Sequence, residues 1–213
     1  LYIKLKAETG ELEGMADRAL SLKGETTADS ELLTNLGLEL LMKGDVDSAK
    51  KLAEKAKNFQ VTGDTRSSLG LLQLSVGDDE AFNNLEKAFT NNPQSKIAAD
   101  NLATAYLASE RYEDAFKLGG KWASEGKLTE GTMLQAVSKA RMGQGEQAKA
   151  LFNQVLADNP SHFMARAGLL EVEVQNGSYE EADKLFEQWV VEDGMTGLFR
   201  HYLSAVKAER DID

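Results

Sequence analysis

One short run in the chain has the spacing of a cofactor site. Residues 143–148 read GQGEQA, which matches the G-x-G-x-x-A fingerprint that holds a dinucleotide pyrophosphate. That fingerprint works after a β-strand, where the N-terminus of the next helix faces the phosphates. Here the run follows residues 129–142, whose apolar residues have helical spacing. We therefore interpret its glycines as a turn between two helices and expect no cofactor.

The titratable residues suggest no catalytic group either. His162 falls in a predicted turn and His201 on a predicted last helix, and isolated histidines are more often surface or packing residues. Carboxylate runs such as Glu180-Glu181 lie at predicted helix starts, where the helix dipole favours anions. Cysteine is absent, which removes disulfides and thiolate metal sites. We expect no enzyme activity and no metal, although a fold alone does not exclude a site.

Composition narrows the classes of partner. The 213 residues carry a net charge of −11, and the pI is near 4.8, so a phosphate backbone would be repelled and we expect no nucleic-acid partner. No apolar run approaches the roughly 20 residues that a bilayer span needs, so we expect no membrane span in this segment. The chain opens at Leu1 without a methionine, and we expect it to be part of a longer protein.

The dominant pattern is a repeat with a period of 33 or 34 residues. Its markers are small or apolar pairs at Tyr2-Ile3, Leu36-Gly37, Leu69-Gly70, Leu102-Ala103, Ala136-Val137 and Leu169-Leu170. A break follows each pair at Gly10, Gly44, Gly77, Glu110, Gly143 and Gly177, and then a small residue or methionine at Met15, Ala49, Ala81, Ala115, Ala148 and Ala182. Glycine ends one helix in a left-handed conformation, and a small residue lets the next helix pack closely. A fixed period of this length predicts stacked helix pairs.

These motifs resemble the tetratricopeptide repeat family. Besides the pairs, Tyr106 with Ala115 and the segments NLEKAFTNNP (84–93) and LFNQVLADNP (151–160) match its motif. The resemblance implies an all-α fold, a right-handed superhelical solenoid of stacked antiparallel helix pairs. The repeat style also resembles bacterial repeat lipoproteins of exosortase and exopolysaccharide systems, which implies a periplasmic or envelope location.

The repeat predicts a single domain over residues 1–213, because no linker rich in Pro, Ser or Gly divides it. We expect about five full repeats at 30–62, 63–95, 96–129, 130–162 and 163–196, with a partial repeat at 1–29 and a terminal helix at 197–209. The expected helices number about thirteen and lie at 1–9, 12–23, 29–43, 46–58, 64–76, 79–91, 96–109, 112–124, 129–142, 145–158, 163–176, 179–191 and 197–209.

Several residues depart from the family pattern. Arg66 and Arg166 stand where an aromatic residue is expected early in the first helix of a repeat, and Glu110 stands where glycine is usual. Trp122 and Trp189 occupy a position that is normally small. We expect both indoles to be largely buried against the following repeat, and Gly119 to make room for Trp122.

The resemblance implies that binding takes place on the concave side, which the first helices of the repeats line. The predicted peptide-binding groove is mostly apolar or neutral-polar and consists of Asn35, Leu38, Met42, Leu71, Asn101, Thr104, Leu107, Leu134, Gln135, Ser138, Met142 and Gln175. Amides among them can donate to and accept from a peptide backbone. We therefore expect a protein-protein interaction scaffold that binds a peptide or protein segment. The alternative is a structural or self-association module of a larger bacterial envelope assembly.

Overall fold

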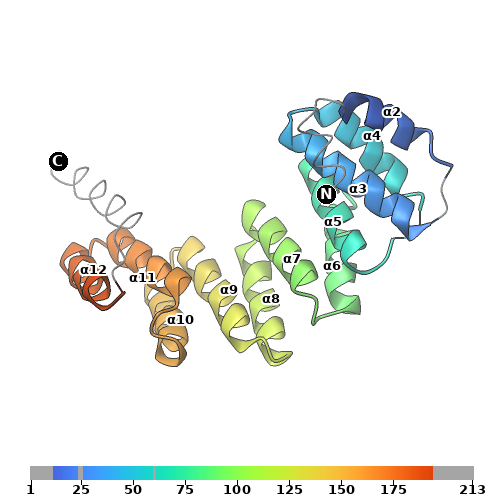
Figure 1. The fold of residues 1–213 in the computed structure, drawn as a ribbon. Coiled ribbons are helices and arrows are strands. Elements are labelled where there is room, and N and C mark those ends of the chain that lie inside the picture. Colours follow the sequence, from blue (N-terminus) through green and yellow to red (C-terminus); the bar gives the residue numbers. More distant parts are fainter. Residues whose placement is uncertain (1–11, 24–25, 60, 194–213) are drawn as a thin grey trace. The chain divides into compact units, whose positions relative to one another are not determined.

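The computed structural model describes residues 12–23, 26–59 and 61–193, and all regular structure in these ranges is helical. The helices, drawn in Figure 1, are α2 (Leu12–Leu20), α3 (Thr27–Met42), α4 (Val46–Ala56), α5 (Gly63–Ser75), α6 (Ala81–Asn91), α7 (Lys96–Ala108), α8 (Tyr112–Ser124), α9 (Leu128–Arg141), α10 (Gly145–Asp158), α11 (Phe163–Gln175) and α12 (Tyr179–Asp193). The all-α prediction is confirmed, and the predicted helices from 12 to 191 are present with similar ends. The helices predicted at 1–9 and 197–209 lie outside the described residues.

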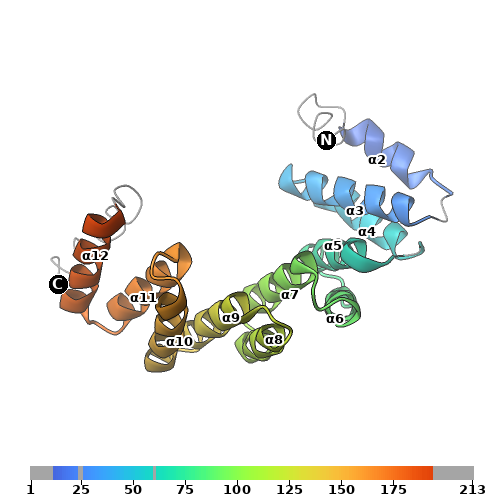
Figure 2. The ribbon, with the colours of Figure 1, turned by 60° about the horizontal axis from the view of Figure 1, so that its bottom comes forward.

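The chain divides into two compact units, residues 1–109 and 110–213. In the first unit, α3 packs on α4 and α5 packs on α6, while α3, α5 and α7 form a row in which each helix contacts the next. Figure 2 shows these three helices following one another in that order. In the second unit, α8 packs on α9, α9 on α10 and α10 on α11. Each unit is therefore a stack of helices joined by short turns, and a single domain over the whole chain stays a prediction.

The core of the first unit lies where the repeat places its apolar and small residues. Leu36, Ala49, Leu52 and Ala56 are fully buried, with exposed fractions of 0%. Alanine has only a methyl group, which allows the close packing of α3 and α4, and Ala49 and Ala56 belong to the same buried cluster as Leu36 and Leu52. The close approach buries the leucines of both helices, and this burial is the main force that holds a helix pair together.

Local polar contacts fix the helix ends. Gly44, with φ of +84°, ends α3 in the left-handed conformation that the repeat predicts. Thr26 and Asp29 form a capping box at the start of α3. Asp45 caps α4 by accepting a hydrogen bond from the Ser48 amide at 3.0 Å. Hydrogen bonding with Ser48 lowers the pKa of Asp45.

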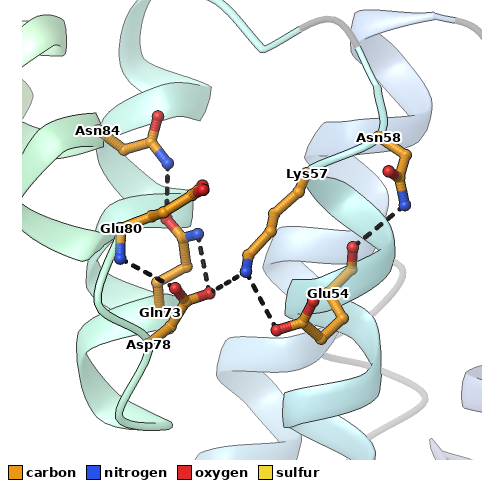
Figure 3. Close-up of polar contacts among 7 residues, drawn as sticks. All are labelled: Glu54, Lys57, Asn58, Gln73, Asp78, Glu80 and Asn84. Atoms are coloured by element: carbon orange, nitrogen blue, oxygen red, sulfur yellow. Dashed lines mark hydrogen bonds and ion pairs between the residues drawn. The ribbon is translucent and has the colours of Figure 1, made fainter.

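A polar network joins the helix pair α3–α4 to the helix pair α5–α6 (Figure 3). Lys57, just after α4, forms an ion pair of 2.6 Å with Asp78 in the turn between α5 and α6. Asp78 also accepts a hydrogen bond from Gln73 Nε2 at 3.1 Å, and Gln73 Oε1 accepts one from Asn84 Nδ2 at 2.7 Å. Gln73 is fully buried and both its amide atoms are satisfied, which is the condition under which a buried polar group is tolerated.

Two arginines stand at positions where the family has an aromatic residue. Each donates a hydrogen bond to a carbonyl oxygen in the connection that precedes its helix. Arg66 Nη2 donates to the Val61 carbonyl oxygen, and Arg166 Nε donates to the Pro160 carbonyl oxygen at 2.6 Å. The Arg166 guanidinium also lies 5.0 Å from the ring centre of Trp189 on α12. A guanidinium that stacks on an aromatic ring and bonds a carbonyl can take the place of a packed aromatic side chain.

For the other residues that depart from the family pattern, the predicted burial of both tryptophans is confirmed. Trp122 and Trp189 are buried, with exposed fractions of 3% and 5%, and Glu110 has a positive φ of 57°. Trp189 belongs to a core cluster with residues of α9, α10 and α11. The repeat after Trp189 lies outside the described residues. The prediction for Gly119 differs, because the atoms nearest to it belong to α9 and not to Trp122.

Candidate binding surface

Each first helix of the first unit leaves one stripe of side chains exposed or half-buried. The stripes are Glu31, Asn35, Leu38 and Met42 on α3; Asp64, Ser68, Leu71 and Ser75 on α5; and Ile97, Asn101, Thr104 and Ala108 on α7. Within each stripe the spacing is four, three and four residues, which is one face of an α-helix. Because α3 contacts α5 and α5 contacts α7, the stripes lie on neighbouring helices, and we call them together the α3–α5–α7 face.

Hydrogen bonds hold neighbouring helices of this face in register. Asn101 Nδ2 on α7 donates to Ser67 Oγ on α5 at 3.0 Å. Ser95, which caps α7, donates through Oγ to Asp64 Oδ1 on α5 at 2.5 Å. These bonds link residues one repeat apart, so the face has a defined spacing along the row.

The predicted groove residues of the first unit all have some solvent exposure. Asn35, Met42 and Thr104 are exposed, and Leu38, Leu71, Asn101 and Leu107 are half-buried. Among the large apolar side chains that the structure describes, Met42 has the largest exposed fraction, 69%. One of the amides is engaged already, since Asn101 bonds Ser67. The first unit therefore presents apolar and amide side chains together on one set of helices.

The predicted residues of the second unit are less uniform. Leu134 and Ser138 on α9 are buried, with exposed fractions of 7% and 0%, and Ser138 Oγ donates to the Leu134 carbonyl oxygen at 2.7 Å. Gln135 is half-buried and lies against Gly119 of α8. We leave these three out of the binding surface. At Gln135 the physical reason is the close approach of α8, whose Gly119 lies against this residue. Met142 is half-buried and Gln175 is exposed.

Three large apolar side chains of the second unit are exposed outside the predicted groove. Leu128 at the start of α9 and Phe163 and Met164 at the start of α11 have exposed fractions of 52%, 49% and 60%. In the sequence, these residues can be recognised by their position at the start of a first helix, ahead of its buried apolar residues.

The residues with catalytic or cofactor spacing serve as turns and caps. The GQGEQA run follows α9, with Gly143 in the turn at φ of +72° and Gly145 opening α10. His162 caps α11, since its Nδ1 accepts a hydrogen bond from the Ala165 amide at 3.2 Å. Among the described residues no group of His, Asp and Glu side chains is arranged to hold a metal ion, and no helix is long and apolar enough to cross a membrane.

Comparison with known proteins supports the repeat family. The family model described as tetratricopeptide repeat matches residues 133–194. Among solved structures, a tetratricopeptide repeat protein from Parabacteroides merdae is similar with a TM-score of 0.61 at 19% identity, over 83% of this chain and 72% of that one. A thermophilic tetratricopeptide repeat protein from Thermus thermophilus has a TM-score of 0.56 at 20% identity, over 84% of this chain and 99% of that one.

A third structure, of pilF from Pseudomonas aeruginosa, has a TM-score of 0.55 at 17% identity, over 92% of this chain and 87% of that one. At these identities the likeness shows the fold. No curated protein matches the sequence significantly. The resemblance to repeat lipoproteins and the envelope location that it implies stay predictions.

Proposed function

We propose that this chain, which is similar to tetratricopeptide repeat proteins, is a non-enzymatic scaffold that binds a peptide or protein segment on the first helices of its repeats. Repeat solenoids use extended concave surfaces for binding. The supporting observation is the α3–α5–α7 face, where exposed Met42 and half-buried Leu38 and Leu71 lie beside the amides of Asn35 and Asn101.

The chemistry of this face suits an extended or helical segment. Leucine and methionine side chains bury apolar groups of a ligand, and methionine adapts to varied shapes. An exposed amide such as that of Asn35 both donates to and accepts from a peptide backbone. A segment lying across three helices meets both kinds of group more than once, so the affinity comes from several modest contacts.

Binding can be tested with peptides selected from a displayed library against the purified chain. Dissociation constants would be measured for the wild type, Met42→Asp, Asn35→Ala and, as a control on the second helix α6, Lys87→Ala. All three side chains are exposed, so the fold should tolerate each change. We expect Met42→Asp to weaken binding by about fivefold or more, which corresponds to about 1 kcal/mol. Loss of binding in Lys87→Ala with both face variants silent would place the ligand elsewhere.

A self-association module is the second candidate. It is favoured by the exposed apolar side chains of Leu128, Phe163 and Met164 in the second unit. Exposed apolar patches often mark interfaces. Light scattering after size exclusion would show a dimer or larger species for the wild type, and Leu128→Glu with Met164→Glu would convert it to a monomer. A wild type that is monomeric at all concentrations contradicts this candidate.

A further inference from the structure

The α3–α5–α7 face has an uneven distribution of charge. Across its three helices the only basic residues are Arg66 on α5 and Lys96 on α7, and α3 has none. Arg66 points away from the stripes, because Nη1 donates to Asn84 Oδ1 of α6 at 2.9 Å and Nη2 to the Val61 carbonyl oxygen. Lys96 pairs with Asp100 on the same helix. The cations of these helices are therefore engaged within the protein.

Carboxylates begin two of the three stripes. Glu31 on α3 and Asp64 on α5 are both exposed, and they precede the apolar positions of their stripes. Asp64 accepts the hydroxyl of Ser95, a neutral donor that leaves its negative charge uncompensated. Since the first helices of successive repeats run in the same direction, the two carboxylates lie at the same end of their helices. The face thus has an acidic edge, followed by an apolar strip that includes Leu38 and Leu71.

We propose that the occupant of the α3–α5–α7 face is an amphipathic segment with lysine or arginine along one side. This inference rests on the proposed function and adds the chemistry of the partner. Apolar side chains of the segment would lie on the strip, and its cations would face Glu31 and Asp64. The net charge of −11 attracts a cationic segment at long range and repels an acidic one. An acidic peptide tail would meet no free cation on these three helices.

The expected energetic effect is modest and measurable. Ion pairs at exposed positions contribute little, so each carboxylate should strengthen binding of a lysine-bearing peptide by about two- to fivefold. The apolar strip supplies the remaining affinity. Charge on this face therefore selects among apolar segments and does not replace the apolar contacts.

The test uses three sets of synthetic peptides on one leucine framework, with lysine, glutamine or glutamate at all other positions. Affinity would be measured for the wild type, for Glu31→Gln/Asp64→Asn, and for Asp47→Asn/Asp79→Asn, which removes the same charge from exposed positions outside the face. We expect the lysine set to bind the wild type most tightly and the glutamate set least. The preference for lysine should disappear in Glu31→Gln/Asp64→Asn and persist in Asp47→Asn/Asp79→Asn.

The other outcomes separate the two ideas. Equal binding of the lysine and glutamine sets to the wild type would overturn the cationic partner and leave the scaffold function standing. An equal loss of preference in both double variants would mean general attraction to an acidic protein, which also overturns the inference. If no set binds, the inference is overturned, and the scaffold function is decided separately by the peptides selected from the displayed library. Circular dichroism of each variant confirms that differences in binding do not reflect unfolding.

Discussion

Gly119 of α8 and Gly131 of α9 face each other at a distance that leaves no room for a side chain. A Cβ atom on Gly131 would lie 2.4 Å from the Gly119 carbonyl oxygen and 2.5 Å from the Ala123 amide nitrogen. Both neighbours are backbone atoms, which cannot turn aside as a flexible side chain can. This contact sets how closely α8 and α9 approach.

Gly131→Ala is therefore expected to destabilise the protein by about 1–3 kcal/mol, in the range of overpacked cores. Gly120→Ala is the matched control, because a Cβ there would meet only the end of the Gln135 side chain at 3.2 Å. Alanine favours helix by up to about 1 kcal/mol over glycine, so the control should be neutral or stabilising. Urea unfolding measures both, and a Gly131→Ala midpoint equal to wild type contradicts the prediction.

Glu110 has a left-handed backbone conformation, with φ of 57°, whereas the corresponding turn positions of the other repeats have glycine in this conformation. A residue with a Cβ is strained there by about 1 kcal/mol or more. Glu110→Gly should therefore raise the thermal midpoint. Glu110→Ala removes the same charge but keeps the Cβ, so its midpoint should stay close to wild type. If alanine stabilises as much as glycine, the effect comes from charge and not from the backbone.

The ion pair of Lys57 and Asp78 predicts a pH-dependent contribution to stability. The hydrogen bond to Asp78 is the main cause that raises the pKa of Lys57 above its usual 10.5. Burial tends to raise the pKa of Asp78, but hydrogen bonds from Lys57, the Glu80 amide and Gln73 outweigh it and hold the pKa below the usual 3.8. The lysine contribution is present below pH 10.5 and is lost as pH rises through its folded pKa. The aspartate contribution is present above pH 3.8 and is lost as pH falls through its folded pKa.

Asp78→Asn should accordingly lower the free energy of unfolding at neutral pH by about 1–3 kcal/mol, as for hydrogen bonds to charged groups. The difference from wild type should vanish well below pH 3.8, where the wild-type carboxyl is protonated. Glu181→Gln is the control, because its pair with Lys184 is exposed and 3.7 Å long. If Asp78→Asn lowers the free energy of unfolding by the same amount at neutral and at acidic pH, the ion pair is not the cause of the lost stability.

Trp122 is buried, yet its indole Nε1 has no hydrogen-bond partner. Trp122→Ala should cost about 3–5 kcal/mol, as for truncation of a large aromatic core residue. Trp122→Phe keeps much of the apolar volume and removes an unsatisfied donor, so its cost should stay below about 1.5 kcal/mol. Denaturant unfolding distinguishes the two. A phenylalanine variant as unstable as the alanine variant would show that the indole nitrogen has a partner after all.

Helix positions could be predicted because they depend on local periodicity and turn chemistry. The apolar spacing of α3, the glycine at 44 and the small residue at 49 together define a helix pair within a short stretch of consecutive residues. The predicted groove residues of the first unit followed from the same register, since an exposed stripe is the complement of a buried one. Their role in binding is a separate matter, and it remains the proposal stated above.

The sequence by itself determined the all-α class, the period and the ends of the described helices, because these depend on residues a few positions apart. Tertiary structure decided which residues of α9 are covered: α8 lies against Gly131 and Gln135, and Leu134 and Ser138 are buried. It also decided that Lys57 meets Asp78 across two repeats. The rotation of a helix about its axis and the pairing of distant charges depend on the surface of the neighbouring helix, which no local pattern encodes.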